Sequence, residues 1–153
     1  MSTYALPDEP SPSAWTHLAV NPIWPLFAVM FAGSWLAWPW AVFNGFVVGC
    51  PRRWSELGIG IVGFAVNIVY SITVIVLFGQ EVIPEGWMPY LFISLSVWRL
   101  AVSYFLYDFQ SQTFDLYEYT GGRVRSGLPI LIIGFFARPL LMDLHPLVAL
   151  ILL

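Results

Sequence analysis

The sequence has 153 residues, of which 59% are hydrophobic and only 10% are charged, whereas about 25% of the residues in an average soluble domain are charged. With a mean hydropathy of +0.77, the chain has too little polar side chain to cover a water-facing surface, so we expect an integral membrane protein in contact with lipid. The net charge is −3, all six basic side chains are arginines, and no basic run is present. We therefore expect no nucleic-acid partner.

Residues 1–20 are rich in proline and serine, and Asp8 and Glu9 are their only charged side chains. The segment lacks the positively charged region that begins a cleavable signal peptide. We therefore expect an irregular N-terminal tail and no cleaved leader, followed by a transmembrane domain over 21–153.

A helix needs about 20 apolar residues to cross a hydrocarbon core of about 30 Å. Four apolar stretches meet this requirement, and they predict a small all-α bundle of four transmembrane helices. The predicted spans are 23–49, 57–79, 87–107 and 128–153. Pro39 is expected to kink the first helix and Pro139 the fourth. The fourth span is the least regular, because Arg138, Asp143 and Pro146 interrupt it.

Small residues recur along one face of each of the first two spans. The rows are Gly33, Ala37, Ala41, Gly45 and Gly49 in the first span and Gly60, Gly63, Asn67 and Ser71 in the second. Small side chains at this spacing allow helix backbones to approach closely, so we expect these two helices to pack as a tight pair. Asn44 and Asn67 are expected to bond to a neighbouring helix or to a backbone carbonyl.

Two arginines lie deep in predicted spans, Arg99 in the third and Arg138 in the fourth. A charge at that depth costs about 2.5–3.5 kcal/mol on insertion scales and needs a partner. Asp143 is the only acid well inside a predicted span, so an ion pair with either arginine is one interpretation. The other arginine then needs a different partner, which is a backbone carbonyl freed at Pro139, another subunit, an anionic lipid or a ligand. A ligand or transport site would include Asn67.

Several tryptophans lie at the same depth, away from the interfaces that tryptophan prefers. They are Trp35, Trp38, Trp40 and Trp98. We interpret them as a packing surface, as cation–π partners of the buried arginines, or as the wall of a site for a flat ligand. No cofactor is predicted, although a lipid, a quinone or a pigment would fit such a wall. A haem is disfavoured, because the two histidines are His17, in the tail, and His145.

Arginine-bearing connections alternate with connections that carry no basic residue. Arginines occur in 50–56 and in 108–127, whereas the tail and the loop 80–86 have none. Because cytoplasmic loops collect Arg and Lys, we expect both arginine-bearing loops in the cytoplasm and both termini outside it, in a cell (inner) membrane. Segment 108–127 either extends the third helix to a stop at Gly121 and Gly122 or docks as an interfacial hairpin.

No catalytic signature is present, because the sequence has no H-E-x-x-H, G-x-S-x-G, P-loop or C-x-x-C motif. Cys50 is the single cysteine, so it forms neither an internal disulfide nor a cysteine-based metal site. We expect a non-catalytic accessory or scaffold subunit, or an immunity-type partner, of a larger inner-membrane complex. One alternative is a small homo-oligomeric transporter or channel with Arg99, Arg138 and Asp143 along a polar path. A third is a pigment- or haem-binding redox subunit.

Overall fold

The computed structural model describes residue 10, residues 13–144 and residues 150–152. The expectation of an all-helical chain is confirmed for this part of the molecule, which contains no strand. The elements in chain order are the 3-10 helix η1 (Thr16–Leu18), α1 (Ile23–Phe31), α2 (Ser34–Val48), α3 (Arg53–Gly79), the 3-10 helix η2 (Glu85–Trp87), α4 (Met88–Tyr119) and α5 (Leu128–Leu144).

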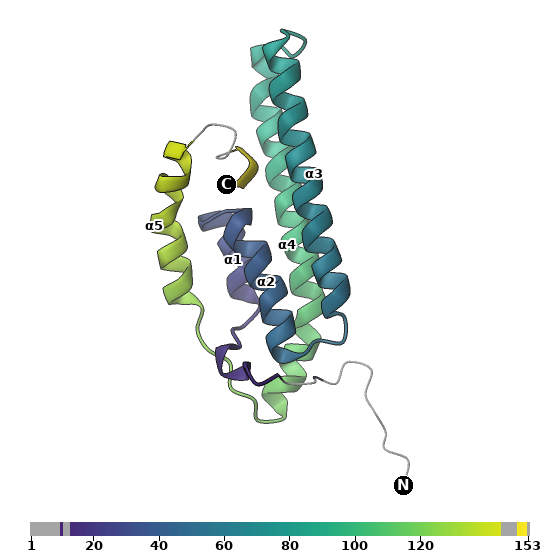
Figure 1. The fold of residues 1–153 in the computed structure, drawn as a ribbon, viewed down its shortest axis with the longest axis vertical. Helices are drawn as coiled ribbons and strands as arrows, with labels where there is room; N and C mark the ends of the chain where they lie inside the picture. Colours follow the sequence, from purple (N-terminus) through teal and green to yellow (C-terminus); the bar gives the residue numbers. More distant parts are fainter. Residues whose placement is uncertain (1–9, 11–12, 145–149, 153) are drawn as a thin grey trace.

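The two longest helices, α3 and α4, form an antiparallel hairpin that extends beyond the other helices at one end (Figure 1). They have 27 and 32 residues, which at 1.5 Å per residue gives about 40 Å and 48 Å. Within the described residues, the helical stretches Arg53–Gly79 and Glu85–Tyr119 are the two that are long and apolar enough to cross a membrane. Only 22% and 28% of their most apolar stretches are buried, so most of this apolar surface faces outward.

The segment after residue 107 extends α4 and does not form a separate hairpin. α4 continues to Tyr119, and the chain then turns at Gly121, whose φ is 91°. The N–H of Gly122 donates to the carbonyl oxygen of Tyr117 at 2.9 Å, and that of Gly121 donates to Glu118 at 3.0 Å. This pair of bonds is a Schellman motif, which ends a helix at a residue with positive φ.

The first predicted span differs from the expectation, because residues 23–49 form two helices and not one. α1 and α2 are separated at Ala32 and Gly33, where the backbone of Gly33 has φ 110°. The chain reverses at this point, so α1 and α2 lie side by side (Figure 1). Pro39 lies inside α2 without ending it. The reversal occurs where glycine supplies a conformation that other residues rarely adopt, and the proline does not break the helix.

The reversal brings the described part of the tail back to the end of α2. Asn44 holds the main chain of Val20 with both amide atoms, since its Oδ1 accepts from the N–H at 3.0 Å and its Nδ2 donates to the carbonyl at 2.5 Å. The N–H of Arg125 donates to the carbonyl of Ala19 at 2.8 Å. Residues 13–20 therefore lie at the same end as both arginine-bearing connections, whereas the sequence predicted opposite ends.

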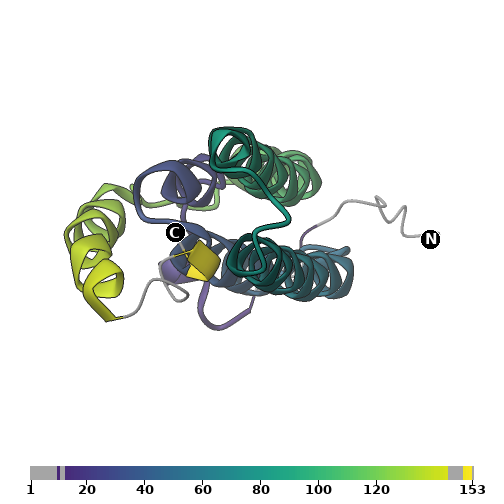
Figure 2. The same cartoon turned by 90° about the horizontal axis from the view of Figure 1, so that it is seen from above.

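The last helix, α5, packs on α1 at the edge of the molecule. Seen from above, α1 and α2 lie between α5 and the α3–α4 pair (Figure 2). Pro139 lies inside α5, which continues to Leu144, while His145 and Pro146 fall outside the described residues. Residues 150–152 return to α3 and α4, where Leu150 accepts a hydrogen bond from Arg99. The stretch 128–153 is therefore not one straight helix.

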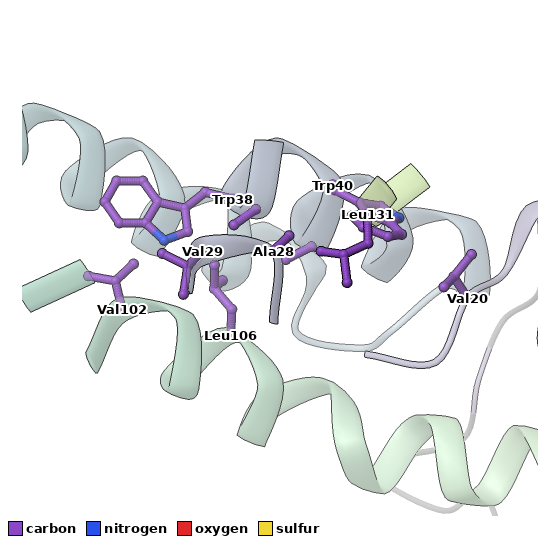
Figure 3. Close-up of a cluster of buried hydrophobic side chains, with 10 residues drawn as sticks. Val20, Ala28, Val29, Trp38, Trp40, Val102, Leu106 and Leu131 are labelled. Atoms are coloured by element: carbon purple, nitrogen blue, oxygen red, sulfur yellow. The ribbon is translucent and has the colours of Figure 1, made fainter. Parts of the chain in front are cut away.

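Buried apolar side chains from α1, α2, α4 and α5 form the main core (Figure 3). The labelled members are Val20, Ala28, Val29, Trp38, Trp40, Val102, Leu106 and Leu131. Trp38 is 1% exposed, its Nε1 donates to Oγ of Ser103 at 2.9 Å, and its ring meets Phe64 edge-on with centroids 4.7 Å apart. This core fixes the α1–α2 hairpin against the α3–α4 pair.

Candidate functional site

A buried arginine on α4 is the centre of the first polar cluster. Arg99 is 7% exposed, and its Nε donates to Oδ1 of Asn67 on α3 at 3.1 Å. Its Nη2 donates to the carbonyl oxygen of Leu150. Asn67 Nδ2 and Ser34 Oγ donate to other carbonyl oxygens of the segment 150–152, the latter at 3.0 Å. Donors from three helices thus converge on one short stretch of main chain.

The helix registers explain why these donors meet. Asn67 lies on the buried face of α3, four residues before Ser71, and Arg99 lies on the buried face of α4, four residues before Ser103. Ser34 is the first residue of α2, directly after the reversal of the chain. Side chains four residues apart lie on the same face of a helix, so each helix presents a polar stripe to the same place.

Within the described residues, backbone carbonyl and amide oxygens, and not a carboxylate, accept the hydrogen bonds of Arg99. Carbonyl groups at a helix end carry partial negative charge and are satisfied by arginine side chains. A nearby hydroxyl, Oγ of Ser71, is fully buried and has no hydrogen-bond partner within the described residues. Three convergent donors suit the oxygen atoms of a carbonyl or an anion.

The other two charged residues singled out in the sequence lie elsewhere. Arg138 is half-buried on α5, where its Nη1 donates to the carbonyl of Met30 at 3.5 Å and its Nε is buried without a partner. Asp143 is exposed on the same helix. Within residues 13–144 and 150–152, neither arginine forms an ion pair with Asp143. The structure therefore brings Arg99 and Asn67 together, whereas Arg138 shares none of their hydrogen bonds but lies close enough to Arg99 to repel it electrostatically.

The deep tryptophans separate into packing residues and one residue near the chain reversal. Trp38 is in the core, and Trp98 packs against it and directs Nε1 to the carbonyl of Gly63 at 3.4 Å. Trp35 is half-exposed, and its Nε1 donates to the carbonyl of Ala32 at 2.8 Å. In the described part of the chain, the arginines that lie over aromatic rings are not these buried ones. Arg52 lies over Phe109, and Arg53 lies over Phe46.

The rows of small residues have two different roles. A β-carbon on Gly60 would lie 3.1 Å from Cγ2 of Val42 in α2, and one on Gly63 would lie 2.9 Å from Cγ1 of Val102 in α4. These glycines allow α3 to approach its two neighbours closely. Gly33 and Gly49, at the ends of the first row, instead have φ values of 110° and 75°, so they turn the chain. Ala37 and Ala41 are buried within α2.

A second polar cluster escaped sequence reasoning. Glu56, in the first turn of α3, is fully buried, and its Oε2 accepts a hydrogen bond of 2.7 Å from Nε2 of Gln110 on α4. The same Nε2 donates to the carbonyl of Ala41 in α2 at 2.7 Å. Gly45 makes room for the carboxyl group, because a β-carbon there would lie 1.9 Å from Oε2. Glu56 therefore joins α3 to both α2 and α4.

The signal for this cluster was helical spacing. The buried positions of α3 are Glu56, Gly60, Gly63, Asn67, Ser71 and Val74. Steps of three and four residues keep these positions on one face, so Glu56 continues the row of small and polar residues that begins at Gly60. Because Glu56 closely follows Arg52 and Arg53, the sequence instead favours a loop that covers residues 50–56.

Cys50 lies beside the second cluster, in the connection between α2 and α3. The side chain is 1% exposed. Burial raises the pKa of the Cys50 thiol to about 12, and the adjacent Glu56 carboxyl group adds to this effect. A thiol in this state is neutral at physiological pH and is a poor nucleophile, so Cys50 is part of the packing.

Comparisons with protein-family models, with curated proteins and with solved structures find no match to this chain.

Proposed function

We propose that the chain is an integral membrane protein that serves as a non-catalytic subunit of a larger complex in a cell membrane. Membrane insertion is supported by the outward faces of α3 and of the first part of α4, which are largely apolar, whereas the last part of α4 exposes Asp108, Asp115 and Glu118. Examples are Ile61, Val69, Ile93 and Val97, each at least 59% exposed. In water such a continuous apolar surface is unfavourable, whereas hydrocarbon solvates it.

The observation that carries the subunit proposal is the outer surface of α5. This helix exposes Ile133 at 69%, Phe136 at 71% and Leu140 at 70%, and it also exposes the carboxylate of Asp143. Asp143 lies about 22 Å along the helix axis from the start of α5, which is within a hydrocarbon core of about 30 Å if the helix spans it. An unpaired charge there is costly in lipid.

A helix of a partner subunit would offset this cost. It would cover the aromatic side chains of α5 and supply a hydrogen-bond donor to the exposed carboxylate of Asp143. Lipid tails can cover the aromatic side chains, but they cannot donate a hydrogen bond to Asp143. An immunity-type role, in which the covering partner is a membrane-acting toxin, belongs to the same proposal, because it uses the same kind of contact.

Purification of the full chain in mild detergent tests this proposal. We expect a membrane protein to co-purify in fixed stoichiometry and to be lost in the Asp143→Asn and Phe136→Ala variants. The matched controls are Glu85→Gln, at the start of η2, and Phe92→Ala, which removes a half-exposed ring from α4. A chain that purifies alone, or a partner that ignores both α5 variants, would overturn the proposal.

A small transporter for an anion is the second candidate, and the Arg99 cluster favours it. The reversal between α1 and α2 and the segment 150–152 meet there, beside the two long helices (Figure 1). Broken segments that meet at a buried charge are typical of ion and substrate sites in membrane transporters. Anion flux into liposomes that is lost in Arg99→Gln and kept in Arg123→Gln would support this candidate over the subunit.

A further inference from the structure

Two buried oxygen atoms in the Glu56 cluster have no hydrogen-bond partner. They are Oε1 of Glu56 and Oε1 of Gln110, and both side chains are fully buried. The other atoms of these two groups are satisfied, because Gln110 Nε2 donates to Glu56 Oε2 and to the carbonyl of Ala41, at 2.7 Å each. A buried acceptor without a donor is unfavourable, and here there are two, on side chains that are hydrogen-bonded to each other.

Among the described residues, no cationic side chain is in place to satisfy these oxygens. The two arginines nearest in sequence, Arg52 and Arg53, lie over the rings of Phe109 and Phe46 at 5.4 Å and 5.8 Å. Neither forms an ion pair with Glu56 in the part of the chain that the structure describes. An ionised carboxylate buried without a positive partner is strongly unfavourable.

The remaining neighbours are neutral or weak donors. α2 contributes Gly45 and the carbonyl of Ala41, α4 contributes Gln110 and Thr113, and the connection between α2 and α3 contributes the thiol of Cys50. Cys50 is the titratable group that lies against the carboxyl group, and a thiol is only a weak donor. On α4, the acidic side chain of Asp108 is exposed. None of these groups donates a hydrogen bond to either orphan oxygen within the described residues.

We propose that Glu56 is a proton-binding site, with its carboxyl group protonated in the folded protein and its Oε1–H donating to Oε1 of Gln110. One proton then satisfies both orphan oxygens. Together with the bond from Nε2 to Oε2, it closes a ring of two hydrogen bonds between an acid and an amide. A primary amide has two N–H groups, and the second one is already used by Ala41, so this arrangement employs every donor and acceptor of both side chains.

The position of the ring gives the proton a structural effect. The ring joins the first turn of α3 to α4, and its amide also donates to the carbonyl of Ala41 in α2. The proton therefore lies in a hydrogen-bond network that connects three helices. Loss of the proton would place two acceptor oxygens against each other without a donor, which favours separation of α3 from α4 at this end. The site therefore couples proton binding to the contact between these helices.

Infrared spectroscopy of the purified full chain tests the proposal. At neutral pH we expect a C=O stretching band of a protonated carboxyl group that shifts in D₂O and disappears in Glu56→Gln. Glu118→Gln, the same substitution at an exposed position of α4, should leave the band unchanged. Gln110→Met should keep the band and move it to higher frequency, because the acid loses its partner.

Three results would overturn the proposal. They are the absence of a protonated-carboxyl band in the wild type, a band that survives in Glu56→Gln, and a band that is abolished by added Na⁺ or Ca²⁺, which would make the occupant a metal cation. If Glu56→Gln fails to fold, the shift in Gln110→Met decides, because a band that belongs to another acid would not move.

Discussion

Gly45 and Glu56 are matched in shape across the contact between α2 and α3, since a β-carbon on the glycine would lie 1.9 Å from Oε2 of the carboxyl group. The glycine therefore has a specific role in α2, a helix in which glycine is otherwise unfavourable. It leaves the space that allows a polar side chain to lie against a helix backbone. Several measurable consequences follow from this contact and from the neighbouring clusters.

Gly45→Ala should destabilise the protein, because the carboxyl group of Glu56 must move and its bond to Gln110 is lost. We expect a loss of about 1–3 kcal/mol, the usual cost of overpacking a buried site, seen as a lower midpoint of thermal unfolding in detergent. Gly58→Ala is the matched control in α3, where a β-carbon meets nothing within 4 Å. It should be neutral or stabilising by up to about 1 kcal/mol. Equal effects of the two substitutions would contradict the packing described for Gly45.

Arg99→Leu should lower stability more than Arg123→Leu. The substitution leaves Oδ1 of Asn67 and the carbonyl of Leu150 without their donor, and each buried orphan costs about 1–3 kcal/mol. Arg123 is exposed, so its replacement should change the unfolding midpoint little. Arg138→Leu should have a small effect on the isolated chain, because Arg138 makes one long bond of 3.5 Å, and a larger effect on partner binding. Similar midpoints for the Arg99 and Arg123 variants would refute this ranking.

Stability should fall as pH rises if Glu56 carries a proton. The folded protein then binds one more proton than the unfolded chain, so the free energy of unfolding decreases with pH by up to about 1.4 kcal/mol per unit. We expect the unfolding midpoint of the wild type to drop as the pH rises above about 4.3, the ordinary pKa of a glutamate side chain, until the folded protein also loses the proton. The slope should flatten in Glu56→Gln, whose amide keeps its hydrogen atoms at every pH. A slope that is the same in both proteins would assign the dependence to other groups.

Cys50 should react slowly with thiol reagents while the protein is folded. Its side chain is buried, and burial raises its pKa to about 12, so the thiolate fraction is very small at pH 8. A Cys50→Ser, Ser55→Cys protein places a single thiol at an exposed position of α3 and should be labelled much faster by maleimide. Denaturant should remove the difference. Rapid labelling of native Cys50 would show that the connection between α2 and α3 opens.

Much of the helical content could be predicted from the sequence, because long apolar runs have few alternatives. The expected stretch 57–79 lies within α3, and the extension of the third helix to glycines 121 and 122 follows from their freedom at positive φ. The break of the first stretch could not be predicted in the same way. In the sequence, Gly33 fits equally well as a packing residue in a row of small side chains and as a turn residue. Only the contacts between α1 and α2 decide between these two roles.

The polar clusters were predicted in part. Arg99 and Asn67 stood out because each is polar in an apolar run, but their acceptors lie at 150–152, far away in sequence. The sequence favours Asp143 as the partner of a buried arginine, because it is the only acid well inside a predicted span. The main-chain oxygens that accept the bonds of Arg99 cannot be recognised from a sequence. Glu56 was overlooked because it follows Arg52 and Arg53, and its burial depends on the space beside Gly45.

The reversal of the chain at Gly33 also bears on how often the polypeptide passes through a bilayer. If α1 and α2 enter and leave the bilayer through the same face, they contribute no net passage, and we expect residues 13–20 and the connection before α3 in one compartment. An epitope at the N-terminus and one inserted after Gly121 should then be reached by the same membrane-impermeant reagent, while an epitope near Glu85 should be protected from it.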